Sequence, residues 1–110
     1  KERPLALHTT AGVVAVRPRE ILYVESTLHY LNYHTLSGEY RVRGVMGQAE
    51  RELANCHFAR CARSFLVNLR YVSAIEGEDV VLGSQRIRIT RTKRTEFMER
   101  FSRFLGGMEP

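Results

Sequence analysis

The sequence has 110 residues, of which 44% are hydrophobic and 26% are charged. This length suits one domain, and the composition excludes a disordered chain, a collagen-like repeat or a membrane-spanning segment. The formal net charge of +5, carried by 15 arginines and 2 lysines, favours a polyanionic partner, because the arginine fork matches phosphate and guanine edges.

The first half of the chain reads mostly as short strands. Residues 1–11 carry little signal and are expected to be a leading segment. Strands are predicted at residues 12–16, 21–25, 28–35 and 39–43. Pro18 ends the first of them, residues 26–27 are expected to form a turn, and residues 37–38 form a hairpin turn. Apolar residues on both faces of 28–35 suggest a strand covered on both sides.

The period then changes to that of a helix. Residues 45–54 are predicted to form a short amphipathic helix of about three turns. Further strands are predicted at residues 58–60, 65–69, 71–76, 80–82 and 86–90. A terminal helix follows at 92–105, with three phenylalanines and Leu105 on one face, and ends at residues 106–107. The predicted fold is mainly β, with nine or ten short strands, one central helix and a C-terminal helix.

Catalysis and metal binding have weak support. Asp79 is the single aspartate and lies in an apparent turn, and no nucleophile elbow or P-loop is present. Cys56, His57 and Cys61 lack the four-ligand spacing of a zinc site, so Cys61 is expected to be a small buried hydrophobic residue. We therefore expect no enzyme activity, no metal and no cofactor. Two cysteines without C-x-x-C spacing also favour a reduced, intracellular setting.

The terminal helix offers an alternative function. Its Lys93, Arg94, Arg100 and Arg103 lie opposite the phenylalanines, as in a membrane-surface or protein-interaction helix. We prefer the interpretation in which the phenylalanines complete the core, because a domain of this size needs that apolar area.

Nucleic-acid binding has the most convergent support. Three clusters of basic or hydrogen-bonding residues fall at turns or strand ends, each beside an apolar strand. They are Ser26, Thr27 and His29; Arg60, Arg63 and Ser64; and Thr90, Arg91, Lys93 and Arg94. Such residues supply phosphate contacts and read base edges. Composition alone leaves a merely solvated basic surface equally open.

A resemblance to a known family separates these two interpretations. The segment Phe58-x-Arg60-x-x-Arg63-Ser64-Phe65-Leu66-Val67-Asn68 resembles the signature F-x-R-x-H-R-S-[FY]-[IL]-V-N of LytTR-type DNA-binding domains. Residues 21–26 resemble the family's I-x-Y-[IV]-E segment, and His29-Tyr30 follows at the expected distance. Residues 82–91 resemble its L-x-x-G-x-x-[IL]-x-[IV]-S-R run, with Thr90 in place of serine.

The resemblance implies an elongated, almost all-β domain with stacked sheets, spanning residues 1–110 with a core of about 10–105. It implies the output domain of a cytoplasmic two-component response regulator, and this chain is expected to be a fragment lacking an N-terminal regulatory domain. The expected partner is double-stranded DNA carrying promoter direct repeats, bound through successive major grooves, with a possible homodimer on DNA and no membrane.

The resemblance also implies residue roles. His29 with Tyr30 would contact DNA from the first loop, Arg63 from the central motif, and Arg91 or Lys93 from the last loop. Arg60 is expected to hold phosphate, and a one-residue register decides whether Arg91 or Thr92 faces the groove. Ala62 departs from the family, which often has histidine there. Asn68 is expected to be a structural residue at a strand end.

Overall fold

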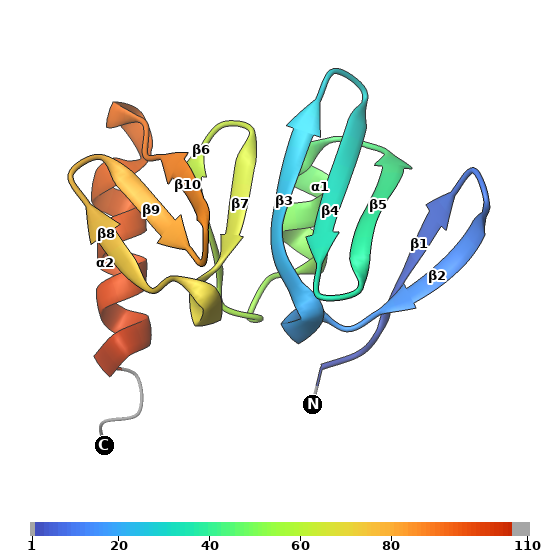
Figure 1. Cartoon of the computed structure of the whole chain (residues 1–110), viewed down its shortest axis with the longest axis horizontal. Helices are drawn as coiled ribbons and strands as arrows, with labels where there is room; N and C mark the ends of the chain where they lie inside the picture. Colours follow the sequence, from blue (N-terminus) through green and yellow to red (C-terminus); the bar gives the residue numbers. More distant parts are fainter. Residues whose placement is uncertain (1, 107–110) are drawn as a thin grey trace.

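The structure, a computed structural model, describes residues 2–106 (Figure 1). In this range it has ten short strands, two α-helices and two single-turn 3-10 helices, η1 and η2. The elements are β1 (Leu5–Thr9), β2 (Gly12–Val16), η1 (Pro18–Glu20), β3 (Ile21–Thr27), β4 (Tyr30–Thr35), β5 (Gly38–Arg43), α1 (Met46–Glu52), β6 (Phe58–Ala62), β7 (Phe65–Asn68), η2 (Leu69–Tyr71), β8 (Ala74–Glu76), β9 (Asp79–Leu82), β10 (Gln85–Arg88) and α2 (Arg91–Gly106). The prediction of a mainly β fold with two helices is confirmed.

The strands form three antiparallel sheets. The largest has the order β5-β4-β3-β7-β6. Of the two strands of the central motif, β7 pairs with β3, and β6 pairs with β7 at the edge of the sheet. A three-stranded sheet, β10-β9-β8, lies to one side with α2, and the β1–β2 hairpin lies to the other (Figure 1). Helix α1 lies behind the large sheet in the same view.

The large sheet is buried on both faces along its central strands. Val24 pairs with Leu66, and both belong to the core that also contains α1. Tyr23 pairs with Val67, and both belong to the core shared with the small sheet and α2. Because successive residues of a strand point to opposite faces, one strand pair serves two cores. Each fully buried aliphatic side chain contributes about 1.5–3 kcal/mol, so the central motif is held rigidly from both sides.

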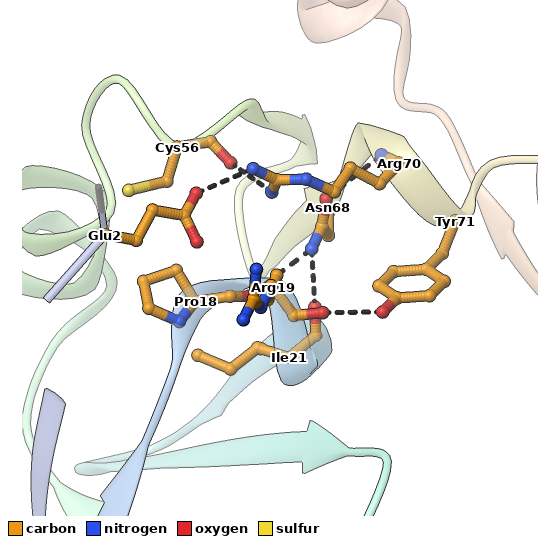
Figure 2. Close-up of polar contacts among 8 residues, drawn as sticks. All are labelled: Glu2, Pro18, Arg19, Ile21, Cys56, Asn68, Arg70 and Tyr71. Carbon is orange, nitrogen blue, oxygen red and sulfur yellow. Dashed lines mark hydrogen bonds and ion pairs between the residues drawn. The ribbon is translucent and has the colours of Figure 1, made fainter. Parts of the chain in front are cut away.

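Asn68, the last residue of β7, connects the segments before and after the central strands (Figure 2). The side chain is fully buried, and its Nδ2 donates to the carbonyl oxygens of Ile21 (2.9 Å) and Pro18 (3.4 Å). Its Oδ1 accepts from the amide of Arg70 at 3.0 Å. Nearby, the Tyr71 hydroxyl donates to the carbonyl of Arg19. The amide of Asn68 therefore links η1, β3 and η2, which agrees with the structural role expected for it.

Several element boundaries differ from the sequence predictions. Residues 1–11 are not a featureless leading segment, because β1 pairs with all of β2 and buries Leu7 against the first core. The turn expected at residues 26–27 is also wrong. β3 continues through Thr27, which pairs with Tyr30, and the turn is Leu28-His29. Pairing across the β3–β4 hairpin therefore overrode the local turn preference of Ser26 and Thr27.

The remaining differences concern length and burial. Strand β4 begins at Tyr30 rather than at residue 28, and only one of its faces is fully buried. Helix α1 has seven residues rather than ten, since Leu53 already leaves the helical conformation. The strand expected at 71–76 is reduced to β8, because η2 occupies residues 69–71.

The terminal helix uses its apolar face in the core, as preferred from sequence. Phe97 is fully buried, and Phe101 and Phe104 pack against the second core. Leu105 departs from the expected apolar face, because its side chain is 65% exposed. Helix α2 begins at Arg91 rather than Thr92, and residue 107, expected to end it, lies outside the described residues. Neither helix found in residues 2–106 is long and apolar enough to cross a membrane.

Candidate nucleic-acid interface

The three predicted clusters lie along one edge of the molecule. The β3–β4 turn, the β6–β7 turn and the first turn of α2 all lie at the top of Figure 1, and we call this the upper edge. The strands leading to them run upward from the lower edge, where η1 and η2 lie. Residues that are far apart in sequence are therefore presented on a common side.

The first cluster surrounds the turn Leu28-His29. Thr27 and His29 are exposed, whereas Ser26 and Tyr30 are half-buried. The Thr27 hydroxyl accepts from the Asn32 side chain at 3.1 Å, which braces the end of the hairpin. Leu28 is 93% exposed and has a left-handed φ of 55°, a conformation that costs a non-glycine residue about 1–2 kcal/mol. A strained apolar side chain is thus held out in solvent at the tip.

The second cluster is the β6–β7 turn. Arg63 is exposed and Ser64 is half-buried at the two-residue turn. The pairing of β6 with β7 shifts between Arg60 and Ala62, so Cys61 forms a bulge below the turn. Cys61 is fully buried, as expected, and burial raises the pKa of its thiol to about 12. The bulge thereby turns Arg63 outward above a core of small side chains.

Arg60 differs from Arg63 in its surroundings. Its side chain is only 19% exposed and forms an ion pair with Glu50 of α1, with Nη2 and Oε1 3.1 Å apart. Its Nη1 donates to the carbonyl oxygen of Arg63 at 3.1 Å. Two nitrogens of the guanidinium are therefore used within the protein, and both contacts fix the position of the turn.

The third cluster lies where β10 leads into α2. The amide of Thr90 donates to the Cys61 carbonyl (2.9 Å), and the Thr90 carbonyl accepts from Lys93 in the first turn of the helix. Arg91 and Thr92 are both exposed, while Lys93 and Arg94 are half-buried. The positive end of the helix dipole coincides with these cations. Glu78 is paired with the nearby Arg88, with Nη1 and Oε1 3.1 Å apart.

The three clusters are connected through the central turn. The amide of Ser26 donates to the carbonyl of Ser64 at 3.0 Å, which ties the first turn to the second. The bond from Thr90 to Cys61 ties the third cluster to β6. Among residues 2–106, the side chains of Arg63, Arg91, Lys93 and Arg94 form no ion pair. Arg63 and Arg91 are exposed, so their charges are available at the upper edge, whereas Lys93 and Arg94 are half-buried.

Sequence inspection missed two further arginines beside the first cluster. Arg41 and Arg43 are exposed on β5, and their guanidinium carbons lie 4.0 and 5.7 Å from the centre of the Tyr30 ring. The signal was present in the alternation of residues 39–43, which places Tyr40 and Val42 inward and the arginines outward. The partner of Arg60, Glu50, was also missed because it comes from a separate helix.

The described residues offer no competing metal centre. No group of three or more histidine, cysteine, aspartate or glutamate side chains within 2–106 is arranged to hold a metal ion. Cys56 and Cys61 are both free thiols.

Comparisons with known proteins agree on the family. Residues 11–102 match the family described as the LytTr DNA-binding domain. The sensory transduction protein LytT of Bacillus subtilis (strain 168) is 29% identical over 75 residues, which are 68% of this chain and 31% of that protein. This chain therefore spans less than a third of the length of that relative. A solved LytTr DNA-binding domain from Bacillus cereus superposes with a TM-score of 0.80 at 20% identity, covering 91% of this chain and 97% of that one.

Proposed function

This chain belongs to the family of LytTr DNA-binding domains, and from that premise we propose that it binds double-stranded DNA sequence-specifically. Residues 1–110 would form one binding domain, with a core of about 10–105, within a bacterial transcriptional regulator. The name of the Bacillus subtilis relative, a sensory transduction protein, supports a two-component response regulator as the whole protein. Its setting would be the cytoplasm, and its action would involve no catalysis.

One observation carries the proposal. Three exposed or half-buried basic clusters lie on one edge and are hydrogen-bonded to each other through the central turn. The longest dimension of the fold is 39 Å, whereas successive turns of B-DNA are about 34 Å apart. We propose that the domain lies along one side of a duplex, with loops of the upper edge entering successive major grooves.

Residue roles follow from exposure. Arg63 is exposed and makes no ion pair within 2–106, so it is our candidate for reading a guanine edge. His29, with Tyr30 beside it, would act in the first groove, and Arg91 with Lys93 in the second. Leu28 at the exposed tip suits contact with a thymine methyl group. Ser26, Thr27, Ser64, Thr90 and Arg94 would hold the flanking backbone.

Arg60 fits a positioning role better than a phosphate contact. The phosphate contact expected from the sequence stays a prediction, but two guanidinium nitrogens already bind Glu50 and the Arg63 carbonyl. We infer that Arg60 acts through Arg63 by fixing the turn that carries it.

The experiment that tests the function is selection of bound sequences from a random duplex pool. We expect a direct-repeat site with half-sites about one helical turn apart, bound with a dissociation constant of about 1–50 nM. Affinity should fall steeply with salt, because several phosphate contacts release counterions. Recovery of unenriched sequence would contradict sequence-specific binding.

Liposome sedimentation and a gel shift with random duplex, done side by side, distinguish DNA binding from the alternative function, in which the terminal helix binds a membrane surface. The structure gives that alternative little exposed apolar area, because Phe97, Phe101 and Phe104 pack on the second core. We expect duplex binding without sedimentation on anionic vesicles. The opposite pair of results would favour the membrane-surface interpretation.

A further inference from the structure

The face of the large sheet that carries Tyr30 is only partly covered. Over β3, β7 and β6 this face is buried by the second core, which includes Tyr23 and Val67. Over β4 and β5 it is open, and cross-strand register places Tyr30 opposite Arg43 and Asn32 opposite Arg41. The upper part of the open face is therefore basic and aromatic.

The two arginines are seated on an aromatic ring rather than on a carboxylate. The guanidinium carbon of Arg41 lies 4.0 Å from the Tyr30 ring centre, and that of Arg43 lies at 5.7 Å. The glutamates of the same face, Glu25 and Glu39, lie beside His34 instead, at 3.7 and 3.3 Å. In the part of the chain that the structure describes, neither arginine has an ion-pair partner. A ring holds the cation through its face and leaves the N–H donors directed elsewhere.

A hollow of about 430 Å³ lies against this pair. It is lined by Tyr30, Arg41 and Arg43 together with His8 and Thr9 of β1 and Thr10 of the β1–β2 turn. The Thr9 hydroxyl donates to Gly12 (2.8 Å) and accepts from Ala11 (3.1 Å), which fixes the shape of the turn. The two guanidiniums and the His8 imidazole that line this hollow supply donors that suit the oxygen acceptors of a phosphate diester.

The hollow continues the upper edge. The amide of Gly44, which follows β5, donates to the carbonyl of His29 at 2.9 Å, so the end of β5 is tied to the first turn. In Figure 1 the ends of β1 and β5 lie beyond the β3–β4 turn, on the side away from the β6–β7 turn and α2. A duplex lying along the three clusters would pass its backbone over this hollow.

We propose that Arg41 and Arg43, seated on Tyr30 and completed by the β1–β2 turn, form a fourth DNA contact that binds backbone phosphate outside the first groove. This site rests on the proposed function and extends the footprint at one end only. It supplies affinity without sequence information, because its donors face phosphate oxygens rather than base edges.

The test is a salt titration of the double variant Arg41→Gln/Arg43→Gln on the selected duplex and on a random duplex. Loss of two phosphate contacts should reduce the magnitude of the slope of log affinity against log salt concentration by about 1.8. It should weaken binding to both duplexes by roughly tenfold and leave the ratio of the two affinities unchanged. Hydroxyl-radical footprinting should show protection lost at one end of the site.

Arg17→Gln/Arg19→Gln is the matched control, because both arginines are exposed beside or within η1 on the lower edge and carry the same total charge. We expect this variant to bind within about twofold of wild type, because its charges lie at the lower edge, opposite the proposed contacts, and exposed charges are largely screened beyond a Debye length of about 8 Å. Equal losses in both double variants would show a general charge effect and overturn the site. If the Arg41/Arg43 variant keeps the wild-type footprint and salt slope, the fourth DNA contact is wrong but the proposed function stands. That result is also expected if the hollow binds an acidic protein segment instead of DNA. Failure of the wild type to bind any duplex would overturn the proposed function as well.

Discussion

The two ends of β7 carry polar side chains with opposite surroundings. At the lower end, Asn68 is fully buried and its amide is hydrogen-bonded to the Ile21 and Pro18 carbonyls and to the Arg70 amide (Figure 2). At the upper end, Arg63 is exposed, and only its carbonyl is engaged, by Arg60. The short strand β7 therefore lies between a turn with an exposed arginine and a buried asparagine whose side chain is hydrogen-bonded.

The difference shows how a single motif divides its work. Buried polar groups are stable when their hydrogen bonds are made. Asn68 makes three such bonds and is fully buried, so its side chain is out of reach of a ligand. Arg63 keeps its donors free because the bulge at Cys61 and the contact from Arg60 hold the turn in place of a salt bridge to Arg63 itself. The lower end therefore stabilises the fold, and we propose that the upper end binds DNA.

Removing the lower anchor should have the largest effect. Asn68→Ala removes three hydrogen bonds at a buried site, those to the Ile21 and Pro18 carbonyls and that from the Arg70 amide. The Pro18 carbonyl keeps its bond from the Ile21 amide, and we expect the free energy of unfolding to fall by about 2–4 kcal/mol. Urea denaturation followed by circular dichroism measures this. Asn32→Ala is the control, because Asn32 is half-buried and makes one hydrogen bond to Thr27. Equal losses in the two variants would remove the structural distinction.

Removing the upper arginine should affect binding rather than folding. Arg63→Ala should weaken binding to the selected duplex by about 1–3 kcal/mol, because a bidentate base contact is lost. Binding to a random duplex should weaken much less. The urea midpoint should stay within about 0.5 kcal/mol of wild type, since the side chain is exposed. Fluorescence anisotropy on both duplexes measures the binding loss. An equal loss on both would show that Arg63 reads no base.

Arg103→Ala is the control for charge in that experiment. Arg103 is exposed in the last turn of α2, away from the upper edge. Its removal lowers the net charge by the same amount and should leave the ratio of specific to random affinity unchanged.

A smaller effect should come from the contact between α1 and the turn. Glu50→Gln removes the ion-pair partner of Arg60 but keeps the cation. If Arg60 positions the turn, this variant should lose several-fold in affinity for the selected duplex, corresponding to about 1 kcal/mol. If Arg60 instead holds phosphate, freeing it should leave binding unchanged or strengthen it. Anisotropy titrations of Glu50→Gln and Arg60→Ala side by side distinguish the two roles.

The labelling rate of Cys61, which lies below the open end, should respond to the lower end of the motif and not to the upper one. Its thiol pKa is raised to about 12 by burial, so at pH 8 alkylation requires the domain to open. The labelling rate of Cys61 should be unchanged by Arg63→Ala and raised about 100-fold by an Asn68→Ala loss of about 2.7 kcal/mol. Mass spectrometry of iodoacetamide-treated protein measures this rate. Faster labelling in Arg63→Ala would show that the turn also stabilises the core.

The same thiol gives an alkaline limit to stability. Because the folded pKa of about 12 exceeds that of an exposed cysteine, the neutral thiol's contribution is complete below about pH 9. It is lost as pH rises from about 9 to 12. The buried Tyr33, with a pKa raised to about 12, acts in the same direction above about pH 10.

Features that depend on local residue patterns or on the family motifs could be predicted from the sequence. The strands at residues 12–16 and 39–43, the apolar face of α2 around Phe97, and the order of the three clusters needed only period and motif. Features built from distant partners were missed. The structural role of Asn68 was predicted, but its partners, 47 and 50 positions away, were not. Arg60 pairs with a helix that precedes its strand, and this partner was also not predicted.

The missed β1 has a related cause. Its residues alternate only weakly in polarity, so the strand forms because β2 supplies a full set of pairing partners. The basic pair on Tyr30 depends likewise on the register between β4 and β5, which fixes Arg43 opposite Tyr30. A register is set by the whole sheet, and a one-residue slip would have pointed both arginines inward.

The measurement that tests the upper edge most directly is amide chemical-shift mapping of the wild-type domain with the selected duplex. We predict shifts concentrated at residues 26–30, 60–64 and 90–94, with little change around Asn68 and η1. Shifts concentrated instead around the hollow of about 610 Å³ lined by Asn55, His57, Phe104 and Leu105 would contradict the proposal that the upper edge binds DNA.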